Sequence, residues 1–292
     1  MPKLIIFTDL DGSLLDHYNY SHKAAENTLE KLEYLGIPVV FNTSKTFSEQ
    51  IVLRETINNR HPFIAENGAA IYLPKVDFMH APEGTSDMGD YWVKEFCKPR
   101  SYWQKLIREN SNEFASEFNT FGDHGYADIM EWTGLTEPEA KLAMQRHYGE
   151  PVRWHGTTER GEEFKEKLKA NGATVLQGGR FIHVSGASDK GVAMNWLSDL
   201  YRQLDAKYSE ALTLAIGDGP NDAAMLEAAD YSLVIKSPEN PAPKLSKTPN
   251  KAKTSDKRIT ANQNESILYS ESFGPEGWAE GVEKILLEMN IN

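Results

Sequence analysis

The chain has 292 residues, of which 40% are hydrophobic and 25% charged, and its formal net charge is -12. This composition is typical of a globular protein with roughly two domains, and the negative charge argues against nucleic acid or an anionic membrane as a partner. The single cysteine, Cys97, excludes an intramolecular disulfide, and no apolar run approaches the ~20 residues that span a bilayer. The start of the chain lacks a signal-peptide layout, so we expect a cytoplasmic protein.

The first predicted strand, residues 3–8, ends at Asp9, Asp11 and Gly12. Side chains alternate along a strand, so both carboxylates leave it on the same side. In a central parallel strand they would lie at the carboxyl edge, where open α/β sheets bind ligands. Neighbouring carboxylates repel unless a cation lies between them, and Mg²⁺ prefers such oxygen ligands. The same residues also fit a solvated turn after a buried strand.

The next segment alternates helices and strands. Thr46 and Glu49 form a predicted capping box that opens one of the helices, and Asn67-Gly68 predicts a tight turn between two strands. The expected elements are a helix at 22–35, a strand at 37–41, a helix of about ten residues after Thr46, and two short strands within 63–72. This alternation predicts a parallel sheet.

The pattern changes near residue 80, where Pro82, Gly84 and Gly89 interrupt it. We expect an inserted α+β domain, with domain boundaries at 1–83, 84–186 and 187–292 and hinges near 82–86 and 185–189. Its predicted elements are helices at 91–110, 137–148 and 162–170 and strands at 174–177 and 180–185.

Strand–helix alternation then returns. A helix is expected from Lys190, and the buried strand 212–216 runs into Gly217-Asp218-Gly219-Pro220-Asn221-Asp222. A helix at 223–229, a strand at 231–236 and a last helix to about Met289 follow. Residues 237–264 are rich in Pro, Lys, Asn, Ser and Thr and predict a mobile loop.

Polar residues follow several of the predicted strands, at positions where the fold alone does not require them. Thr43 or Asp222 could be an ordinary cap, and Lys190 could be a surface lysine. Together, however, carboxylates, a hydroxyl and a lysine at the ends of parallel strands are what a phosphoryl-transfer site needs. The set is Asp9, Asp11, Thr43, Lys190, Asp218 and Asp222.

Asp9-Leu10-Asp11-Gly12, Thr43, Lys190 and Gly217-Asp218-x-x-Asn221-Asp222 stand in the order of the four motifs of the haloacid dehalogenase superfamily, which the chain resembles. The insertion is similar to that superfamily's C2-type cap. The resemblance implies an α/β fold: a Rossmann-like parallel-sheet core with an inserted α+β cap domain. Ser13 stands where threonine is usual.

Five further phrases stand out in the sequence: Asn42-Thr43-Ser44-Lys45-Thr46, Glu66-Asn67-Gly68, Glu131-Trp132-Thr133-Gly134-Leu135, Gly179-Arg180-Phe181-Ile182-His183 and Gly274-Pro275-Glu276-Gly277-Trp278. They resemble the mannosyl-3-phosphoglycerate phosphatase family. The resemblance implies a Mg²⁺-dependent phosphoric monoester hydrolase. Its small-molecule substrate would be 2-O-(α-D-mannosyl)-3-phosphoglycerate. Alternative substrates are glucosyl-3-phosphoglycerate, sucrose phosphate and a hexose phosphate, and an alternative to an enzyme is a catalytically silent binding protein.

The resemblance also implies roles for individual residues. Asp9 is the expected nucleophile, forming an aspartyl-phosphate, and Asp11 the acid and base. The expected metal residues are Asp9, Asp11, Asp218 and Asp222, of which Asp222 also orients Lys190, and the expected phosphate-binding residues are Thr43, Ser44, Lys45, Lys190 and Asn221.

In the cap, Arg146 and Arg180 are candidates for binding a substrate carboxylate, because an arginine fork matches a carboxylate. Candidates for sugar hydroxyls are Glu150, Gln177 and His183. A surface or structural role is the alternative for each of these five residues.

Overall fold

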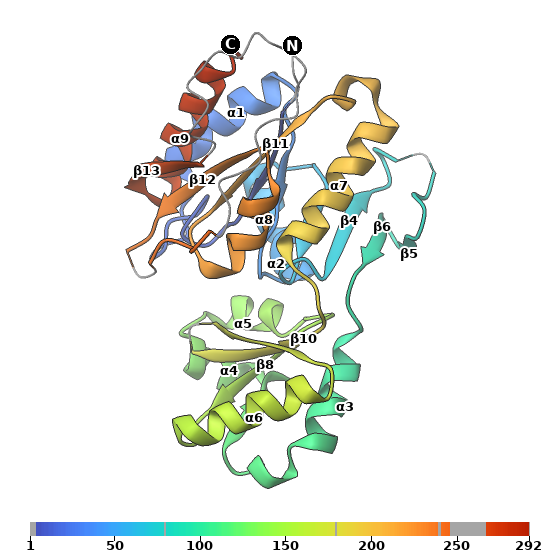
Figure 1. Cartoon of the computed structure of the whole chain (residues 1–292), viewed down its shortest axis with the longest axis vertical. Helices are drawn as coiled ribbons and strands as arrows, with labels where there is room; N and C mark the ends of the chain where they lie inside the picture. Colours follow the sequence, from blue (N-terminus) through green and yellow to red (C-terminus); the bar gives the residue numbers. More distant parts are fainter. Residues whose placement is uncertain (1–3, 79, 179, 239–240, 246–266, 292) are drawn as a thin grey trace.

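The structure, a computed structural model, describes residues 4–78, 80–178, 180–238, 241–245 and 267–291. It has a larger core domain, which carries both chain ends, and a smaller cap (Figure 1). The core elements are β1 (Leu4–Thr8), α1 (Glu26–Tyr34), β2 (Val39–Phe41), α2 (Phe47–Ile57), β3 (Phe63–Ala65), β4 (Ala70–Pro74), β5 (Ser86–Met88), β6 (Tyr91–Glu95), α7 (Lys190–Leu204), β11 (Leu212–Gly217), α8 (Ala223–Ala228), β12 (Tyr231–Lys236), β13 (Ile267–Phe273) and α9 (Gly274–Glu288).

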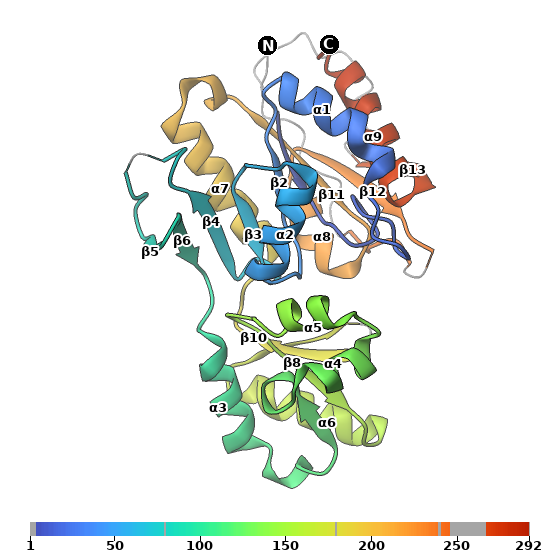
Figure 2. The ribbon, with the colours of Figure 1, turned by 180° about the vertical axis from the view of Figure 1, so that it is seen from behind.

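The core is built on a five-stranded parallel sheet in the order β13-β12-β11-β1-β2. Strand β1 is central and wholly buried, and its side chains alternate between two apolar clusters. Ile6 packs with α1 and α9 on one face, and Phe7 packs with α7 and α8 on the other (Figures 1 and 2). Residues 4–8 are a continuous apolar run because both faces of this strand are covered. The expected α/β fold with a parallel sheet is confirmed.

The hairpin expected within residues 63–72 is present as the antiparallel pair β3–β4. A single parallel bridge between Asn42 and Ile64 places β3 beside the end of β2. Strand β4 then pairs with β6, and β6 with β5, so this second sheet extends the core rather than the cap.

The prediction of a helix beginning at residue 91 was wrong. Residues 91–95 form β6, in which Val93 pairs with Tyr72 of β4. The partner strand lies about twenty residues earlier in the chain, and a pattern confined to residues 91–110 does not contain it. The helix starts only after Pro99, as α3. The helix expected at 137–148 ends at Ala143.

The cap consists of a four-stranded sheet in the order β7-β8-β10-β9 and four helices. Helices α3 and α6 pack on one face of this sheet, and α4 and α5 pack together beside it, with α5 toward the core (Figure 2). The elements are α3 (Arg100–Asn110), β7 (Phe118–Thr120), α4 (Tyr126–Thr133), α5 (Glu137–Ala143), β8 (Glu150–Trp154), α6 (Thr158–Ala170), β9 (Thr174–Gly178) and β10 (Phe181–Ser185).

The chain passes between core and cap at residues 96–99 and again at residues 186–189. The first passage differs from the expected boundary at 83/84 and from the expected hinge at 82–86, because β5 and β6 follow that point and pair within the core. Gly84 and Gly89 have positive φ and are turn positions at the edge of the core sheet. The second passage lies within the expected segment 185–189.

Most of the loop expected at 237–264 lies outside the described residues. Within the part of the chain that the structure describes, no helix is long and apolar enough to cross a membrane.

Candidate active site

The site is built around Asp9, which lies at the carboxyl end of β1. Its backbone N–H donates to Ile216 O of β11 at 2.8 Å, which continues the sheet pairing to the last residue. The indole Nε1 of Trp278, in α9, donates to Thr8 Oγ1 at 2.9 Å and holds the strand end from the other side. Only 6% of Asp9 is exposed, so its carboxylate is buried.

Lys190 joins two of the carboxylates. Its Nζ lies 2.6 Å from Asp9 Oδ1 and 2.7 Å from Asp222 Oδ1, and the side chain is fully buried. Lys190 is the first residue of α7, whose N-cap Asp189 accepts from Val192 N. Asn42 Nδ2 donates to Lys190 O at 3.0 Å. Burial alone would lower the pKa of Lys190, but Asp222 and Asp9 outweigh it and raise the pKa above its usual value.

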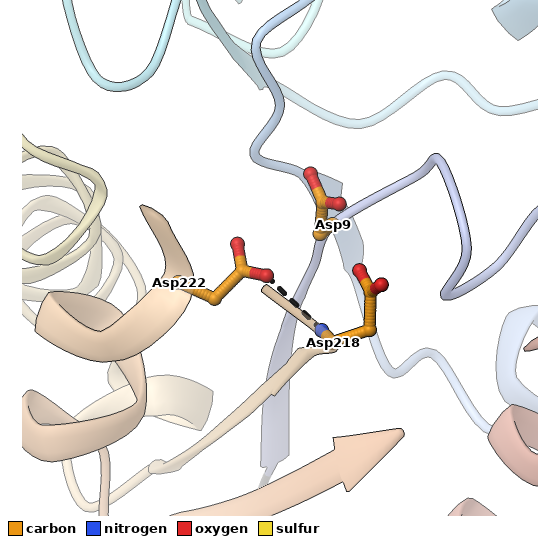
Figure 3. A group of neighbouring side chains, drawn as sticks. All are labelled: Asp9, Asp218 and Asp222. Atoms are coloured by element: carbon orange, nitrogen blue, oxygen red, sulfur yellow. Dashed lines mark hydrogen bonds between the residues drawn. The ribbon is translucent and has the colours of Figure 1, made fainter. Parts of the chain in front are cut away.

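Asp218 and Asp222 come from the turn after β11 (Figure 3). Asp222 Oδ2 accepts the backbone N–H groups of Asp218 at 3.0 Å and Gly219 at 2.9 Å. A Cβ at Gly217 would lie 2.4 Å from Asp222 Cγ, so only glycine allows this turn to close. Asp222 had been expected among the metal residues. Both of its carboxylate oxygens are engaged, by Lys190 and by these two amides, so Asp222 is arranged to orient its neighbours.

The cluster has the chemistry of a cation site. Carboxylate oxygens of Asp9, Asp218 and Asp222 lie within 4.8 Å of one another, and Lys190 contacts two of the three, Asp9 and Asp222. Burial, and then the neighbouring carboxylates, raise the pKa of Asp9 to about 8 although Lys190 opposes the shift. Burial and Asp222 raise the pKa of Asp218 to about 6. A hard divalent cation would offset this surplus negative charge, so the residues fit Mg²⁺.

Gly12 shapes the wall of this cluster. Its φ is +79°, and a Cβ there would lie 2.8 Å from Asp218 Oδ2. Glycine is therefore required both for the turn after Asp11 and for the close approach of the Asp218 carboxylate.

The loop after β2 borders the same site. Thr43 is fully buried, and its Oγ1 accepts the backbone N–H of Lys45 at 3.3 Å. Lys45 Nζ lies 2.9 Å from Asp11 Oδ1, and this contact holds the Asp11 side chain against the loop. The predicted capping box of Thr46 and Glu49 is confirmed at the start of α2.

The loop Glu66–Gly68, between β3 and β4, is a part of the site that sequence reasoning missed. Glu66 N donates to Lys45 O at 3.0 Å, and Asn67 N to Thr43 O at 2.9 Å. Asn221 Nδ2 donates to Asn67 Oδ1 at 3.3 Å. All three loop residues have positive φ. The Asn-Gly pair signalled a turn, but one further residue in the left-handed region, Glu66, beside the residues of the site marks this turn as a functional loop.

The candidate cap residues separate into two groups. Arg146 Nη2 donates to Ser44 O at 2.9 Å, so Arg146 reaches the loop that carries Thr43. Arg180 instead donates to Trp132 O and Thr133 O at the end of α4 and is exposed.

The sugar-binding candidates separate in the same way. Glu150 is fully buried and engaged by Arg100, Gln104 and Gly122, so it is a structural residue of the cap. Gln177 pairs with Ile182, on the opposite face of the sheet from His183. His183 lies near Arg146: burial and then Arg146 lower the pKa of His183 to about 4.

Comparison with known proteins places this geometry in a family. A model of the haloacid dehalogenase-like hydrolases matches residues 6–131 and 153–256. A glucosyl-3-phosphoglycerate/mannosyl-3-phosphoglycerate phosphatase of Methanococcoides burtonii is 33% identical over 288 residues, covering 99% of each chain. The resemblance found in the sequence motifs is confirmed, as is the expected class of enzyme, a phosphoric monoester hydrolase.

Solved structures show the same fold at low identity. A protein of Thermoplasma acidophilum aligns with a TM-score of 0.61 at 16% identity, over 100% of both chains. The sucrose-phosphatase of Synechocystis, solved with sucrose and phosphate, aligns with a TM-score of 0.54 at 15% identity over 97% of this chain and 98% of that one. The site has carboxylates at strand ends and a buried lysine, and the family model matches most of the chain. The chain therefore belongs to the haloacid dehalogenase-like hydrolase family.

Proposed function

We propose that the protein is a Mg²⁺-dependent phosphatase that hydrolyses a glycosyl-3-phosphoglycerate, the mannosyl compound first, to the glycosylglycerate and phosphate. The observation that carries the proposal is the buried contact of Lys190 with Asp9 and Asp222 beside Asp218. This site supplies a nucleophile and fixed positive charge for a phosphoryl group. The substrate class follows from the relative that matches 99% of the chain.

Asp9 is the proposed nucleophile. Its carboxylate attacks phosphorus in line, a bond from Asp9 to phosphorus forms, and the bond to the glycerate oxygen breaks. Asp11 gives a proton to that oxygen, then takes one from the water that hydrolyses the aspartyl-phosphate. Lys45, 2.9 Å from Asp11, orients this carboxyl group.

The other residues bind and stabilise. Thr43 and Lys190 contact phosphoryl oxygens, and Lys190 offsets the charge that develops on them. Asp222 and Asn221 orient Lys190 and the loop around it. Asp9, Asp218 and the backbone carbonyl of Asp11 would hold Mg²⁺, which when bound supplies a Lewis acid at the phosphate.

Arg146 is the proposed ligand of the substrate carboxylate. It touches Ser44, next to Thr43, and lies near His183 on the cap sheet. It is therefore between the phosphate site and the cap, where the glycerate of such a substrate would lie. Arg180 bonds within the cap and supports α4.

The test is a phosphate-release screen over mannosyl- and glucosyl-3-phosphoglycerate, sucrose phosphate and hexose phosphates, with Mg²⁺ and with excess chelator. We expect the highest kcat/KM on a glycosyl-3-phosphoglycerate and no turnover in chelator. Asp9→Asn is the matched variant, since it removes the nucleophile at constant size and loses several decades of turnover. Preference for a hexose phosphate or for sucrose phosphate would refute the substrate class, and chelator-resistant turnover would refute the metal requirement.

A further inference from the structure

The contact between core and cap converges on one carboxylate, that of Glu66. Its side chain is 2% exposed and comes from the core loop between β3 and β4. Its Oε1 accepts the N–H of His147 at 2.6 Å. Its Oε2 accepts the N–H of Gly149 at 2.8 Å and of Tyr148 at 3.2 Å. Successive backbone N–H groups that converge on one anion form a concave anion-binding site, here filled by a residue of the other domain.

The segment held by Glu66 is also anchored on the core by its side chains. Tyr148 is buried within the apolar cluster of the core, and its hydroxyl donates to Glu95 Oε1 at 2.9 Å. Tyr72 OH lies 3.1 Å from His147 Nδ1. Residues 147–149 therefore remain with the core although they belong in sequence to the cap.

This anchor lies beside both passages between the domains. Arg100 N, just after the first passage, donates to His147 O at 2.6 Å. Gly186 N, in the second passage, donates to Cys97 Sγ of the first at 3.1 Å. The anchored segment and the two passages thus form a three-point junction at which the orientation of the cap is set.

Arg146 immediately precedes the anchored segment. Its Nε lies 3.4 Å from Glu66 Oε2, while its Nη2 contacts Ser44 O at 2.9 Å. The backbone N–H of Glu66 donates to Lys45 O. Glu66 therefore holds the phosphate-binding loop through its backbone and the cap arginine through its side chain.

We propose that Glu66 is a positioning residue: it fixes residues 146–149 on the core so that Arg146 faces the carboxylate of a carboxylated phosphomonoester. The choice of that substrate rests on the proposed function. A carboxylate is required because three N–H donors and a guanidinium face it, and the NH₂ of an amide would meet further donors. Glu66 contacts no reacting atom and acts through Arg146.

The test uses Glu66→Gln, which keeps the size of the side chain and removes its charge. The control is Glu150→Gln, because Glu150 is an equally buried carboxylate that pairs with Arg100 and accepts the N–H of Gly122 inside the cap. Hydrogen exchange is followed for peptides spanning 144–150. We expect faster exchange at 147–149 in Glu66→Gln and unchanged exchange there in Glu150→Gln. Unchanged exchange in Glu66→Gln would overturn the anchoring role.

The kinetic readout compares kcat/KM on mannosyl-3-phosphoglycerate with kcat/KM on p-nitrophenyl phosphate, a small ester without the carboxylate. We expect the ratio to fall about tenfold or more in Glu66→Gln, mainly through KM, and to stay constant in Glu150→Gln. In the double variant Glu66→Gln/Arg146→Met, the two losses in this ratio should not add, because both changes remove the same contact with the substrate carboxylate. An unchanged ratio or additive losses would mean that Glu66 serves only the fold.

Two further outcomes are decisive. If Glu66→Gln does not fold, Glu66→Asp, which keeps the charge but shortens the reach, should show the same loss of ratio to a smaller degree. If the wild-type enzyme turns over other phosphomonoesters but no phosphoglycerate glycoside, the proposed function fails, and hydrogen exchange alone decides the anchoring role.

Discussion

Replacement of Lys190 by methionine tests the electrostatic organisation of the site. Methionine has nearly the length of lysine and no charge, so Lys190→Met leaves the space filled and removes the ammonium group between Asp9 and Asp222. Removing one partner of a buried ion pair costs about 3–5 kcal/mol, because the remaining charge is left uncompensated. We expect a loss of that size in the free energy of unfolding in chelator at pH 9, above the pKa of Asp9.

The loss should depend on pH, and its sign follows from Asp9. The pKa of Asp9 is raised to about 8 in the folded protein, from an ordinary value of 3.8, and it rises further without Lys190, whose charge lowers it. A carboxyl group with a raised folded pKa contributes stability below its unfolded pKa and loses it as the pH rises. At pH 5 a proton can take the place of the ammonium group. The deficit of the variant should therefore be smaller at pH 5 than at pH 9 by about 1.4 kcal/mol, the value of the one unit by which pH 9 exceeds the pKa of Asp9.

The assay is urea denaturation followed by tryptophan fluorescence, in chelator, at both pH values. The matched control is Lys31→Met, which breaks the half-exposed pair of Lys31 with Glu283 and should cost no more than ~1 kcal/mol at either pH. A deficit for Lys190→Met below 1 kcal/mol, or one that is equal at pH 5 and pH 9, would refute the account of the cluster.

Other predictions test the metal site, the cap sheet and the carboxylate ligand. Gly12→Ala should weaken Mg²⁺ binding, measured by calorimetry, at least tenfold, because the new Cβ would lie 2.8 Å from Asp218 Oδ2. The control is Gly134→Ala, which introduces the same backbone strain at φ +80° but has no neighbouring atom within 4 Å of the new Cβ. An equal effect of the two substitutions on Mg²⁺ binding would contradict this prediction. The pKa of His183 is lowered to about 4 in the folded protein, so between pH 6.5 and pH 4 the imidazole takes up a proton in the unfolded chain but not in the folded one. The free energy of unfolding should therefore fall by up to about 3 kcal/mol as the pH drops from 6.5 to 4. His183→Gln should flatten that part of the urea-denaturation pH profile, and a profile parallel to wild type would count against it. Arg146→Met should lower kcat/KM on mannosyl-3-phosphoglycerate roughly ten- to hundredfold, the value of a charge-assisted contact. Arg180→Met should change it much less; the reverse order would return Arg180 to the substrate site.

The parts of the site that could be predicted from sequence are those in which local chemistry and strand position coincide. Residues 4–8 form a buried strand because both of its faces are covered, and this required only an apolar run. Asp9 and Asp218 were placed at strand ends because turns follow directly in the sequence. The capping box of Thr46 involves residues three apart, so the sequence contained all of it.

Only the tertiary structure decided how distant segments meet. Strand β6 depends on pairing with β4, which moved the start of the cap past residue 95. The roles of Arg146 and Arg180 look alike in the sequence, but only Arg146 reaches a core loop, through Ser44. Glu66 stood in a family-like phrase at a turn, but its role could not be predicted, because its partners are backbone groups about eighty residues away. Sequence patterns report which residues can form an element or bind an ion, whereas contacts between domains depend on which surfaces face each other after the elements have packed.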